Sequence, residues 1–466
     1  MQEKTPKSEN NVRTMRLTRR GFLRAAALAG LAIGTQSLLA GCGPQEEPAA
    51  PPEEDAPADE APAAEEVTLR FVTNHGESNM PLFEEVVANF HDAHSNIKID
   101  MLDITGAEFY DSINAQGVSG DLPDVWYTRT FDVPVYANKG WTISLQPFID
   151  AEVDEVNVDD FWAAEVEQMT WEGELYALPY DFSNMGMFYN KRAFDEAGVD
   201  YPPDDWTFTD LVDLATQFVE QDGDGNFTKW GSTYGFGIWT FWGHLKGWGG
   251  DILSNDYSEC IANTPESVAC LEFFADARDK GVFPEAGAMP EGVNPFAADL
   301  VPIMNNGSWA TVQMRSLVED KFDFDVAALP KSPSGESCIT AAGGAWGIAA
   351  NSEHPEEAWT FNKYLTSTEA NIILISEPLR SIPGRKSAVP AWEEAAAEGG
   401  LPPENVGIFA EQMPSAWPQA FPYYYQDMDQ AWNNIIIPYF NGVAEADAET
   451  VLQEFQDEVN RIIALG

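Results

Sequence analysis

Four tryptophans lie where an aromatic ring could meet a ligand. Trp239 and Trp242 flank a short aromatic run, and Trp309 and Trp346 lie beside glycines that allow close approach. Flat aromatic faces stack on the apolar C–H faces of a sugar ring, and carboxylates, amides and arginines bind its hydroxyl edge. Because Trp239 and Trp242 are three residues apart, a helix would place both on one face. Core packing is the commoner use of a single tryptophan, but the group favours a carbohydrate-binding surface.

Residues 178–190 combine polar groups with a short apolar run. Asp181 and Ser183 follow a turn-prone Leu-Pro pair, and the chain then runs apolar through residues 185–189. Because Pro179 fixes φ and donates no hydrogen bond, we expect no regular central strand to begin before it. The apolar run predicts a buried strand. Polar groups beside such a crossing suit a site between two bodies.

The first third of the folded chain alternates between strands and helices. This β-α-β-α-β order predicts a parallel sheet with right-handed crossovers. Ligands bind beyond the carboxyl ends of such strands, so loops 74–78 and 127–132 should face one cleft, and His75 and Glu77 become candidate ligand-binding residues. Strands are predicted at 67–73, 97–102 and 124–127, and helices from 81 and around 109–113.

The α/β pattern continues after residue 190. Thr264 and Pro265 predict the start of a helix that ends at Gly281. The other predicted elements are an amphipathic helix at 206–219, strands at 234–238 and 341–350, a helix from 355 and a last helix at 449–464. We find no internal repeat and no membrane-spanning segment in the sequence.

Acidic residues dominate the composition. The chain of 466 residues has 76 Asp and Glu against 25 Lys and Arg, which gives a net charge of −51. Nucleic acids and anionic lipids both require a basic face, so this charge excludes them as partners of the folded part. The length predicts two lobes rather than one core, and the 44% apolar fraction is that of a globular protein.

The N-terminal segment predicts export and anchoring. Residues 18–24 match a twin-arginine export motif, and an apolar segment at 25–40 follows. Residues 39–42 resemble a lipoprotein cleavage box, which makes residues 1–41 a signal peptide and Cys42 the lipidated first residue of the mature protein. Residues 42–66 then form a linker rich in Pro, Ala, Glu and Asp, which is too polar to bury a core and predicts a disordered tether.

Several of these segments resemble extracellular solute-binding protein family 1, the sugar-binding lipoproteins of ABC importers. The resemblance extends in order over residues 67–465. It rests on residues 178–191, on Pro123-Asp124-Val125 followed by Gly140, and on the late segments 381–386 and 423–425. Maltose-type relatives have Glu where Ser183 lies, which leaves the type of sugar open. The resemblance assigns ligand contacts to Thr128, Arg129, Phe131, Asp132, Asp181, Ser183, Trp239, Trp242, Trp309, Arg385 and Tyr424.

The resemblance also implies a fold, a function and partners. The fold would be the two-lobe periplasmic-binding type II fold, with residues 67–180 and 345–385 in the N-terminal lobe and 181–344 and 386–466 in the C-terminal lobe. The protein would be a monomeric receptor that closes on a mono- or oligosaccharide and presents it to the permease and ATPase subunits of an ABC importer. It would need no cofactor and perform no catalysis.

Three other features allow alternative chemistry. Residues 222–226 begin like a calcium-binding loop, but Phe227 replaces the turn glycine and Thr233 the terminal glutamate, which favours a polar turn. Cys260 and Cys270 could form a disulfide in an oxidising compartment, with Cys338 left over; three free thiols are the alternative. The five histidines show no metal spacing.

Two rival functions follow from the same residues. A surface glycoside hydrolase needs only two carboxylates flanking a bond, and the acidic composition leaves such a pair open. A ferric-iron receptor of similar fold could use residues 423–425 as phenolate ligands, although stacking tryptophans serve no purpose around a metal.

Overall fold

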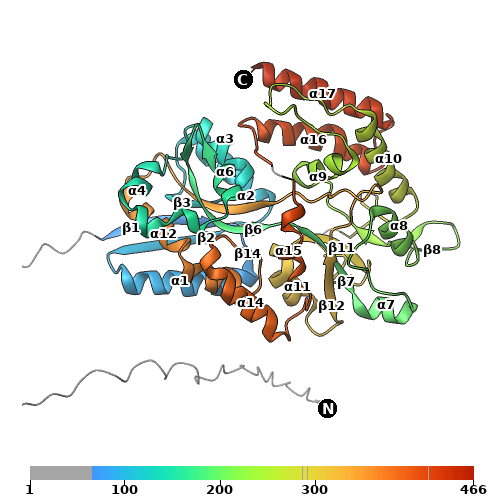
Figure 1. Cartoon of the computed structure of the whole chain (residues 1–466), viewed down its shortest axis with the longest axis horizontal. Helices are drawn as coiled ribbons and strands as arrows, with labels where there is room; N and C mark the ends of the chain where they lie inside the picture. The colour runs from blue at the N-terminus through green and yellow to red at the C-terminus, as the bar shows by residue number, and fades with distance from the viewer. Residues whose placement is uncertain (1–65, 286, 291, 418, 466) are drawn as a thin grey trace, which may run out of the picture. The chain divides into compact units, whose positions relative to one another are not determined.

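The computed structural model describes residues 66–465 except residues 286, 291 and 418. The predicted export motif, the lipidation site at Cys42 and the tether up to residue 65 lie outside the described residues. Residues 64–466 form one unit by their internal contacts, and it contains two large β-sheets and two short hairpins (Figure 1). Among the described residues, none of the helices has the length and hydropathy needed to cross a bilayer.

The first sheet has six strands and is mixed. β1 lies between β2 and β3 and pairs with both in parallel, as the β-α-β pattern predicts. β13 then pairs antiparallel with β3 and with β6, so a segment that returns late in the chain lies at the centre of the sheet. The strands, in order across the sheet, are β14 (Ile382–Pro383), β6 (Ala177–Ser183), β13 (Ala342–Ile348), β3 (Val125–Arg129), β1 (Val67–Thr73) and β2 (Ile97–Asp103).

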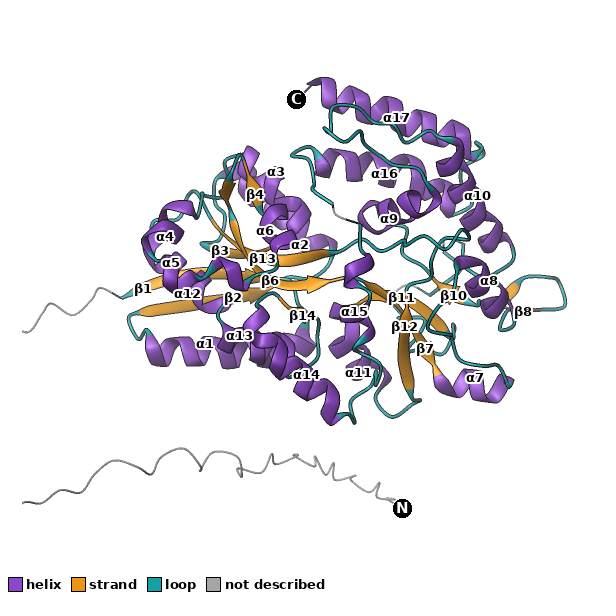
Figure 2. Ribbon diagram, viewed as in Figure 1, coloured by secondary structure: helices purple, strands orange, loops and turns teal. Residues whose placement is uncertain are grey.

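β6 and β13 are buried along their whole length, and helices lie on both sides of the first sheet (Figure 2). Leu69 and Phe71 of β1 are fully buried, and Phe71 packs against Trp346 of β13 with ring centroids 5.1 Å apart. The associated helices are α1 (Met80–Ala93), α2 (Ala107–Ser119), α3 (Val133–Asn138), α4 (Gln146–Ala151), α5 (Val153–Val156), α6 (Ala163–Gln168), α12 (Pro355–Leu365), α13 (Thr368–Asn371) and α14 (Val389–Glu398). A small hairpin, β4 (Thr170–Trp171) and β5 (Glu174–Leu175), follows α6.

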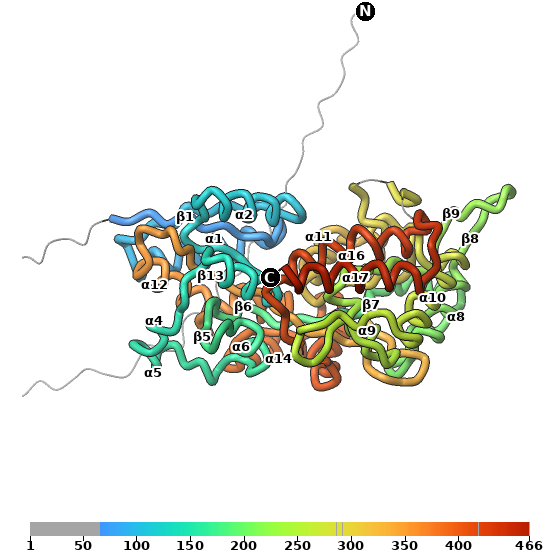
Figure 3. Tube along the Cα trace, turned by 90° about the horizontal axis from the view of Figure 1, so that it is seen from above, coloured from blue at the N-terminus to red at the C-terminus, as the bar shows by residue number. Residues whose placement is uncertain are grey.

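The second sheet has four strands and its own hydrophobic core. Its strands, in order, are β10 (Ser232–Thr233), β11 (Ile303–Gly307), β7 (Met185–Asn190) and β12 (Phe324–Ala328). Its helices are α7 (Lys191–Ala197), α8 (Phe208–Thr216), α9 (Ile238–Trp248), α10 (Pro265–Asp279), α11 (Thr311–Val318), α15 (Ile408–Glu411), α16 (Tyr425–Phe440) and α17 (Ala448–Leu465). The last two lie side by side (Figure 3). A hairpin of β8 (Glu220–Gln221) and β9 (Phe227–Lys229) extends from this part of the chain.

The chain passes between the two sheets through short connections. Only Asn184 separates β6 of the first sheet from β7 of the second, and its side chain donates to the Phe409 carbonyl at 2.8 Å. The chain returns to the first sheet at Ala342. The boundaries predicted at 180/181 and 344/345 therefore fall inside β6 and β13 rather than between elements.

Two local predictions are wrong, and several others are confirmed. β6 begins at Ala177, before Pro179, because a register irregularity between Gly344 and Ala345 of β13 accommodates the missing donor. Residues 234–238 contain no strand, since α9 begins at Ile238. The helix predicted from the Thr264 cap is α10, in which the Thr264 side chain accepts from the Ser267 N–H.

Candidate functional site

A cavity of about 470 Å³ lies between the two sheets. The first sheet contributes the residues that follow the carboxyl ends of its parallel strands, together with the end of β6 and the start of β13, as the strand-end rule predicts. The second sheet contributes residues from α9, α11 and the segment after β11. The lining residues are Asn74, His75, Gly76, Asn79, Thr105, Gly106, Tyr110, Tyr127, Arg129, Phe131, Asp181, Ser183, Trp239, Trp309, Gln313, Ala342, Gly343, Gly344 and Arg380.

An ion pair at the end of β6 forms the polar floor of the cavity. Arg380 donates from Nη1 to Asp181 Oδ2 at 2.7 Å, and both side chains are buried. The Gly344 N–H donates to Asp181 Oδ1 at 2.8 Å. Burial alone would lower the pKa of Arg380, but Tyr180 and Asp181 raise it, so the guanidinium stays charged. The pair offers fixed donors and acceptors of the kind that bind hydroxyl groups.

A second arginine lies at the end of β3. Arg129 donates from Nε to Asp132 Oδ2 at 2.6 Å, and its guanidinium lies 3.8 Å from the Tyr110 ring centroid and 4.3 Å from that of Phe131. Asp132 is fully buried and is not part of the cavity lining. It therefore orients Arg129 from behind, and Arg129 is the group that reaches the cavity.

Three aromatic side chains form the opposite wall. Trp239 at the start of α9 and Trp309 after β11 are partly exposed, with ring centroids 5.7 Å apart. Phe131 from the first sheet stacks on Trp239 at 6.1 Å with an interplanar angle of 25°. The Trp309 ring folds back over Gly307, where a Cβ would lie 2.0 Å from the ring. Glycine therefore lies beside this tryptophan for a steric reason, because a larger residue at position 307 would clash with the Trp309 ring.

The loop after β1 brings His75 to the cavity but not Glu77. The backbone N–H groups of His75 and Gly76 donate to the two carboxylate oxygens of Asp103 at 2.9 and 3.0 Å. The His75 ring hydrogen-bonds to the Thr73 hydroxyl, and burial lowers its pKa well below the usual value, so the ring is neutral. Glu77 is exposed and lies outside the cavity lining.

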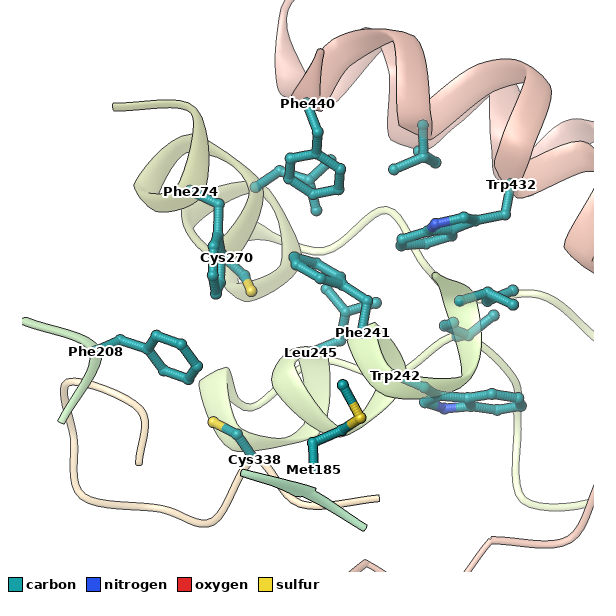
Figure 4. Close-up of a cluster of buried hydrophobic side chains, with 14 of the residues drawn as sticks. Met185, Phe208, Phe241, Trp242, Leu245, Cys270, Phe274, Cys338, Trp432 and Phe440 are labelled. Atoms are coloured by element: carbon teal, nitrogen blue, oxygen red, sulfur yellow. The ribbon is translucent and has the colours of Figure 1, made fainter. Parts of the chain in front are cut away.

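Three predicted residues, Thr128, Trp346 and Trp242, lie outside the cavity lining. Thr128 points away from the cavity because strand residues alternate, so Tyr127 and Arg129 line it instead. Trp346 is fully buried in the first core and stacks on His75 at 5.6 Å. Trp242 is 1% exposed, in the second core, and donates to Asp251 Oδ1 at 2.6 Å (Figure 4).

The two late candidates, Arg385 and Tyr424, are also structural in this fold. Arg385 is buried, donates to the carbonyls of Thr366 and Val156, and lies outside the cavity lining. Its role in the cavity is taken by Arg380, five residues earlier. Tyr424 donates its hydroxyl to the Tyr257 carbonyl and lines a separate groove beside α16 and α17.

The three cysteines among the described residues are not paired. Cys260, Cys270 and Cys338 are all buried free thiols, so the disulfide predicted between Cys260 and Cys270 is wrong and the alternative of free thiols holds. Each packs in the second hydrophobic core, two of them in the cluster of Figure 4. Burial raises the pKa of Cys260 to about 12, which keeps it a thiol rather than a reactive thiolate.

The residues considered for metals do not converge. Residues 222–226 form the turn of the β8–β9 hairpin, in which Asp222 accepts from the Asp224 and Asn226 N–H groups at 2.9 and 3.0 Å, as expected for a polar turn. Tyr425 is buried beside Phe131, whereas Tyr423 packs on Trp171. Within the described part of the chain, no three His, Cys, Asp or Glu residues are grouped to hold a metal ion.

Sequence reasoning missed several residues of the cavity. Period-two alternation along β3 would have selected Tyr127 over Thr128. The helix from residue 107 would have added Tyr110, because its start lies at the same edge of the sheet. Arg380 has no local signal, since only the tertiary fold brings it to Asp181, whereas Gln313 lies four residues after Trp309 and could have been added from that spacing.

The fold defines a class of protein. The chain matches a solute-binding protein of Listeria monocytogenes solved with cycloalternan at a TM-score of 0.77, with 21% identity over 86% of this chain and 100% of that chain. It matches maltose-bound MalE3 of T. maritima at 0.69, with 20% identity over 85% and 100%. The protein therefore has the two-lobe fold of periplasmic binding proteins, with one lobe around each sheet.

Sequence comparison identifies the family to which the chain belongs. It is 23% identical over 318 residues to the maltodextrin-binding protein of Bacillus subtilis, covering 65% of this chain and 70% of the relative. It is also 23% identical over 327 residues to the multiple sugar-binding protein of Streptococcus mutans, covering 66% and 72%. The family of bacterial extracellular solute-binding proteins matches residues 85–402, and the chain belongs to this family.

Proposed function

We propose that this protein is an extracytoplasmic receptor that closes its two lobes on a sugar and delivers it unchanged to an ABC importer. The observation that supports this most directly is the composition of the cavity wall. Trp239 and Trp309 offer aromatic faces from the second lobe, and Arg129 and the Asp181–Arg380 pair offer hydrogen-bonding groups from the first. A sugar ring needs both kinds of contact at once.

The size of the cavity and its position between the two lobes agree with this proposal. A volume of about 470 Å³ lies within the range of small-molecule sites. Because the wall is divided between two lobes, a ligand makes all its contacts only when the lobes are closed. Binding therefore shifts the population toward the closed form, which the permease would recognise.

The rival functions receive no support from the cavity. Among the described residues that line it, Asp181 is the single carboxylate, and Arg380 and the Gly344 N–H already occupy its oxygens. A glycosidase needs two carboxyl groups across the scissile bond. The tyrosines considered for ferric iron are divided between a buried core and a separate groove, so they form no common ligand set.

A thermal-shift screen tests the proposal. Purified residues 66–466 would be heated with a panel of mono- and oligosaccharides, since a ligand of the native state raises the unfolding midpoint. Maltodextrins enter the panel first because the similar protein of Bacillus subtilis is a maltodextrin-binding protein and MalE3 of T. maritima was solved with maltose. We expect at least one sugar to raise the midpoint and to be recovered intact by chromatography. No response across the panel, or a cleaved product, would refute the receptor.

We propose that the mature protein is held at the outer face of the cell membrane by a lipid on Cys42. The support is the order of export motif, apolar segment and cleavage box in residues 18–42. Labelled fatty acid should be incorporated into the wild-type protein in cells and should be absent from Cys42→Ala. Equal labelling of both proteins would exclude this anchor.

A further inference from the structure

Behind the cavity wall, α6 buries oxygen atoms that lack hydrogen-bond donors. Glu165 is 0% exposed, and neither carboxylate oxygen has a partner among the described residues. Gln168, three residues later, donates from Nε2 to the Ala341 and Gln419 carbonyls at 3.1 and 3.0 Å, which leaves its own Oε1 without a partner. The side-chain oxygen of Gln419 is likewise buried and unpartnered. The unpartnered side-chain atoms of these three residues are all acceptors.

Gly343 of β13 leaves the space in which these oxygens meet the main chain. A Cβ at Gly343 would lie 2.4 Å from Glu165 Oε1 and 2.1 Å from the Asp181 carbonyl oxygen. Since both distances are measured from one point, the two oxygens lie within about 4.5 Å of each other. Hard cations bind oxygen at about 2.3–2.6 Å, so one ion can contact both.

The spacing of the helix matches the spacing of the strand beside it. Residues three apart on a helix face are about 5–6 Å apart, and residues two apart on a strand are about 6.6 Å apart. Glu165 accordingly lies against Gly343, and Gln168 lies against Ala341. Glu165 and Gln168 thus approach neighbouring positions at the start of β13 from the same helix.

The charge of the Glu165 carboxylate requires a partner. An ionised carboxylate without a partner in a protein interior is strongly unfavourable. The neighbouring guanidinium of Arg380 is engaged with the Asp181 side chain. A proton on Glu165 would satisfy one acceptor, whereas a cation would satisfy the carboxylate, the amide oxygens and the Asp181 carbonyl together.

We propose that Glu165, Gln168, Gln419 and the Asp181 carbonyl bind a hard cation, Na⁺ or Ca²⁺. The ligand set is all oxygen, which these ions prefer and which thiolate- or imidazole-seeking metals do not. The ion ties α6 to β6 and β13 directly behind the Asp181 side chain in the cavity floor. This inference does not depend on which ligand the cavity binds.

The test compares cation effects on thermal unfolding in matched variants. The whole folded chain, stripped with EDTA, would be heated in choline chloride, NaCl or CaCl₂ at equal ionic strength, because every salt screens a charge of −51. Glu165→Gln removes the buried carboxylate while keeping its shape. Glu167→Gln makes the same charge change on the exposed face of the same helix. Asp222→Asn tests whether a cation bound at the hairpin turn 222–226 causes the effect instead.

We expect NaCl or CaCl₂ to raise the midpoint of the wild type by about 3 °C beyond choline chloride at saturating ion. The rise should persist in Glu167→Gln and Asp222→Asn and vanish in Glu165→Gln, and the effective salt identifies the ion. An equal rise in Glu165→Gln would mean surface binding only and would overturn the site. If Glu165→Gln is more stable than the wild type and no cation acts, a proton occupies the site and the proposal fails.

Discussion

The cavity wall and the core beneath it both contain tryptophan and arginine, but these residues have different roles in the two regions. Trp239 and Trp309 leave part of their rings open to the cavity, whereas Trp242, on the same helix as Trp239, is sealed in the second core with its N–H bonded to Asp251. Arg380 faces the cavity beside Asp181, whereas Arg385 is held in the interior by backbone carbonyls and Asp160 and does not reach the cavity. The difference shows that function here depends on open faces and not on residue type.

The comparison predicts that the core tryptophan matters most for stability. Trp242→Ala removes a fully buried indole and leaves Asp251 without one of its donors, so the free energy of unfolding should fall by about 3–5 kcal/mol. Chemical denaturation measures this change. Trp239→Ala is the matched control and should lose much less. Equal denaturation midpoints for Trp242→Ala and the wild type would contradict the assignment of this residue to the core.

The buried ion pair should show a loss of stability that a second substitution restores. Arg380→Met leaves the Asp181 carboxylate buried without its cation and should lower the free energy of unfolding by about 3 kcal/mol. Adding Asp181→Asn should recover most of that stability but not sugar binding. Calorimetry and denaturation together test this, and retained sugar affinity in the double variant would remove the pair from the site.

The cavity tryptophan should affect binding more than stability. Trp309→Ala removes a ring face that a sugar would cover, which is worth about 1.5–3 kcal/mol, or about 10- to 150-fold in affinity. The denaturation midpoint should change little, because the side chain is partly exposed. Titration calorimetry with the sugar found in the screen measures this affinity. Unchanged affinity would mean that Trp309, like Trp242, does not contact the sugar.

A carboxylate beside the cavity gives stability a pH dependence. Burial raises the pKa of Asp429 on α16 to about 6, with Asp132 adding to the effect and Arg129 opposing it. The folded state therefore binds this proton more tightly than the unfolded state, whose Asp pKa is about 3.9, and the stabilisation by protonation is lost as the pH rises toward 6. In the wild type the free energy of unfolding should therefore fall by about 2 kcal/mol between pH 4.5 and pH 7, and in Asp429→Asn this difference should be absent from the denaturation curves. Identical pH dependence in both proteins would exclude Asp429 as its source.

The smallest predicted effect concerns the thiols. Because Cys260, Cys270 and Cys338 are buried and unpaired, a reductant should leave the thermal midpoint of the folded chain unchanged. A thiol reagent should label all three only after denaturation. Immediate labelling of one thiol, or a midpoint that falls with reductant, would indicate a disulfide.

Much of the architecture was predictable because it depends on local signals. The Thr264 cap, the strand at 67–73 and the order of elements around the first sheet follow from spacing along the chain. The cavity position of Arg129 follows from the rule on strand ends, whereas Asp181 was assigned from the polar groups beside the chain crossing and from the family resemblance. Trp242 was misassigned because residues three apart on a helix still differ by about 60° around the axis and about 4.5 Å along it, enough to move a large side chain from the wall into the core.

Long-range contacts account for what the sequence could not reveal. Arg380 reaches Asp181 across 199 residues, and nothing near residue 380 distinguishes it from Arg385. β13 extends three residues before the predicted lobe boundary because it pairs with the end of β6. Such contacts depend on the assembled sheet, which periodicity along one segment does not specify.

The central claim is that a sugar binds in the cavity between the two lobes. A crystal structure with the sugar that raises the melting midpoint most tests it directly. The account predicts a ring against Trp239 or Trp309 with its hydroxyls near Arg129, Asp181 or Arg380. A sugar bound instead in the groove beside α16 and α17, with the cavity filled only by water, would contradict it.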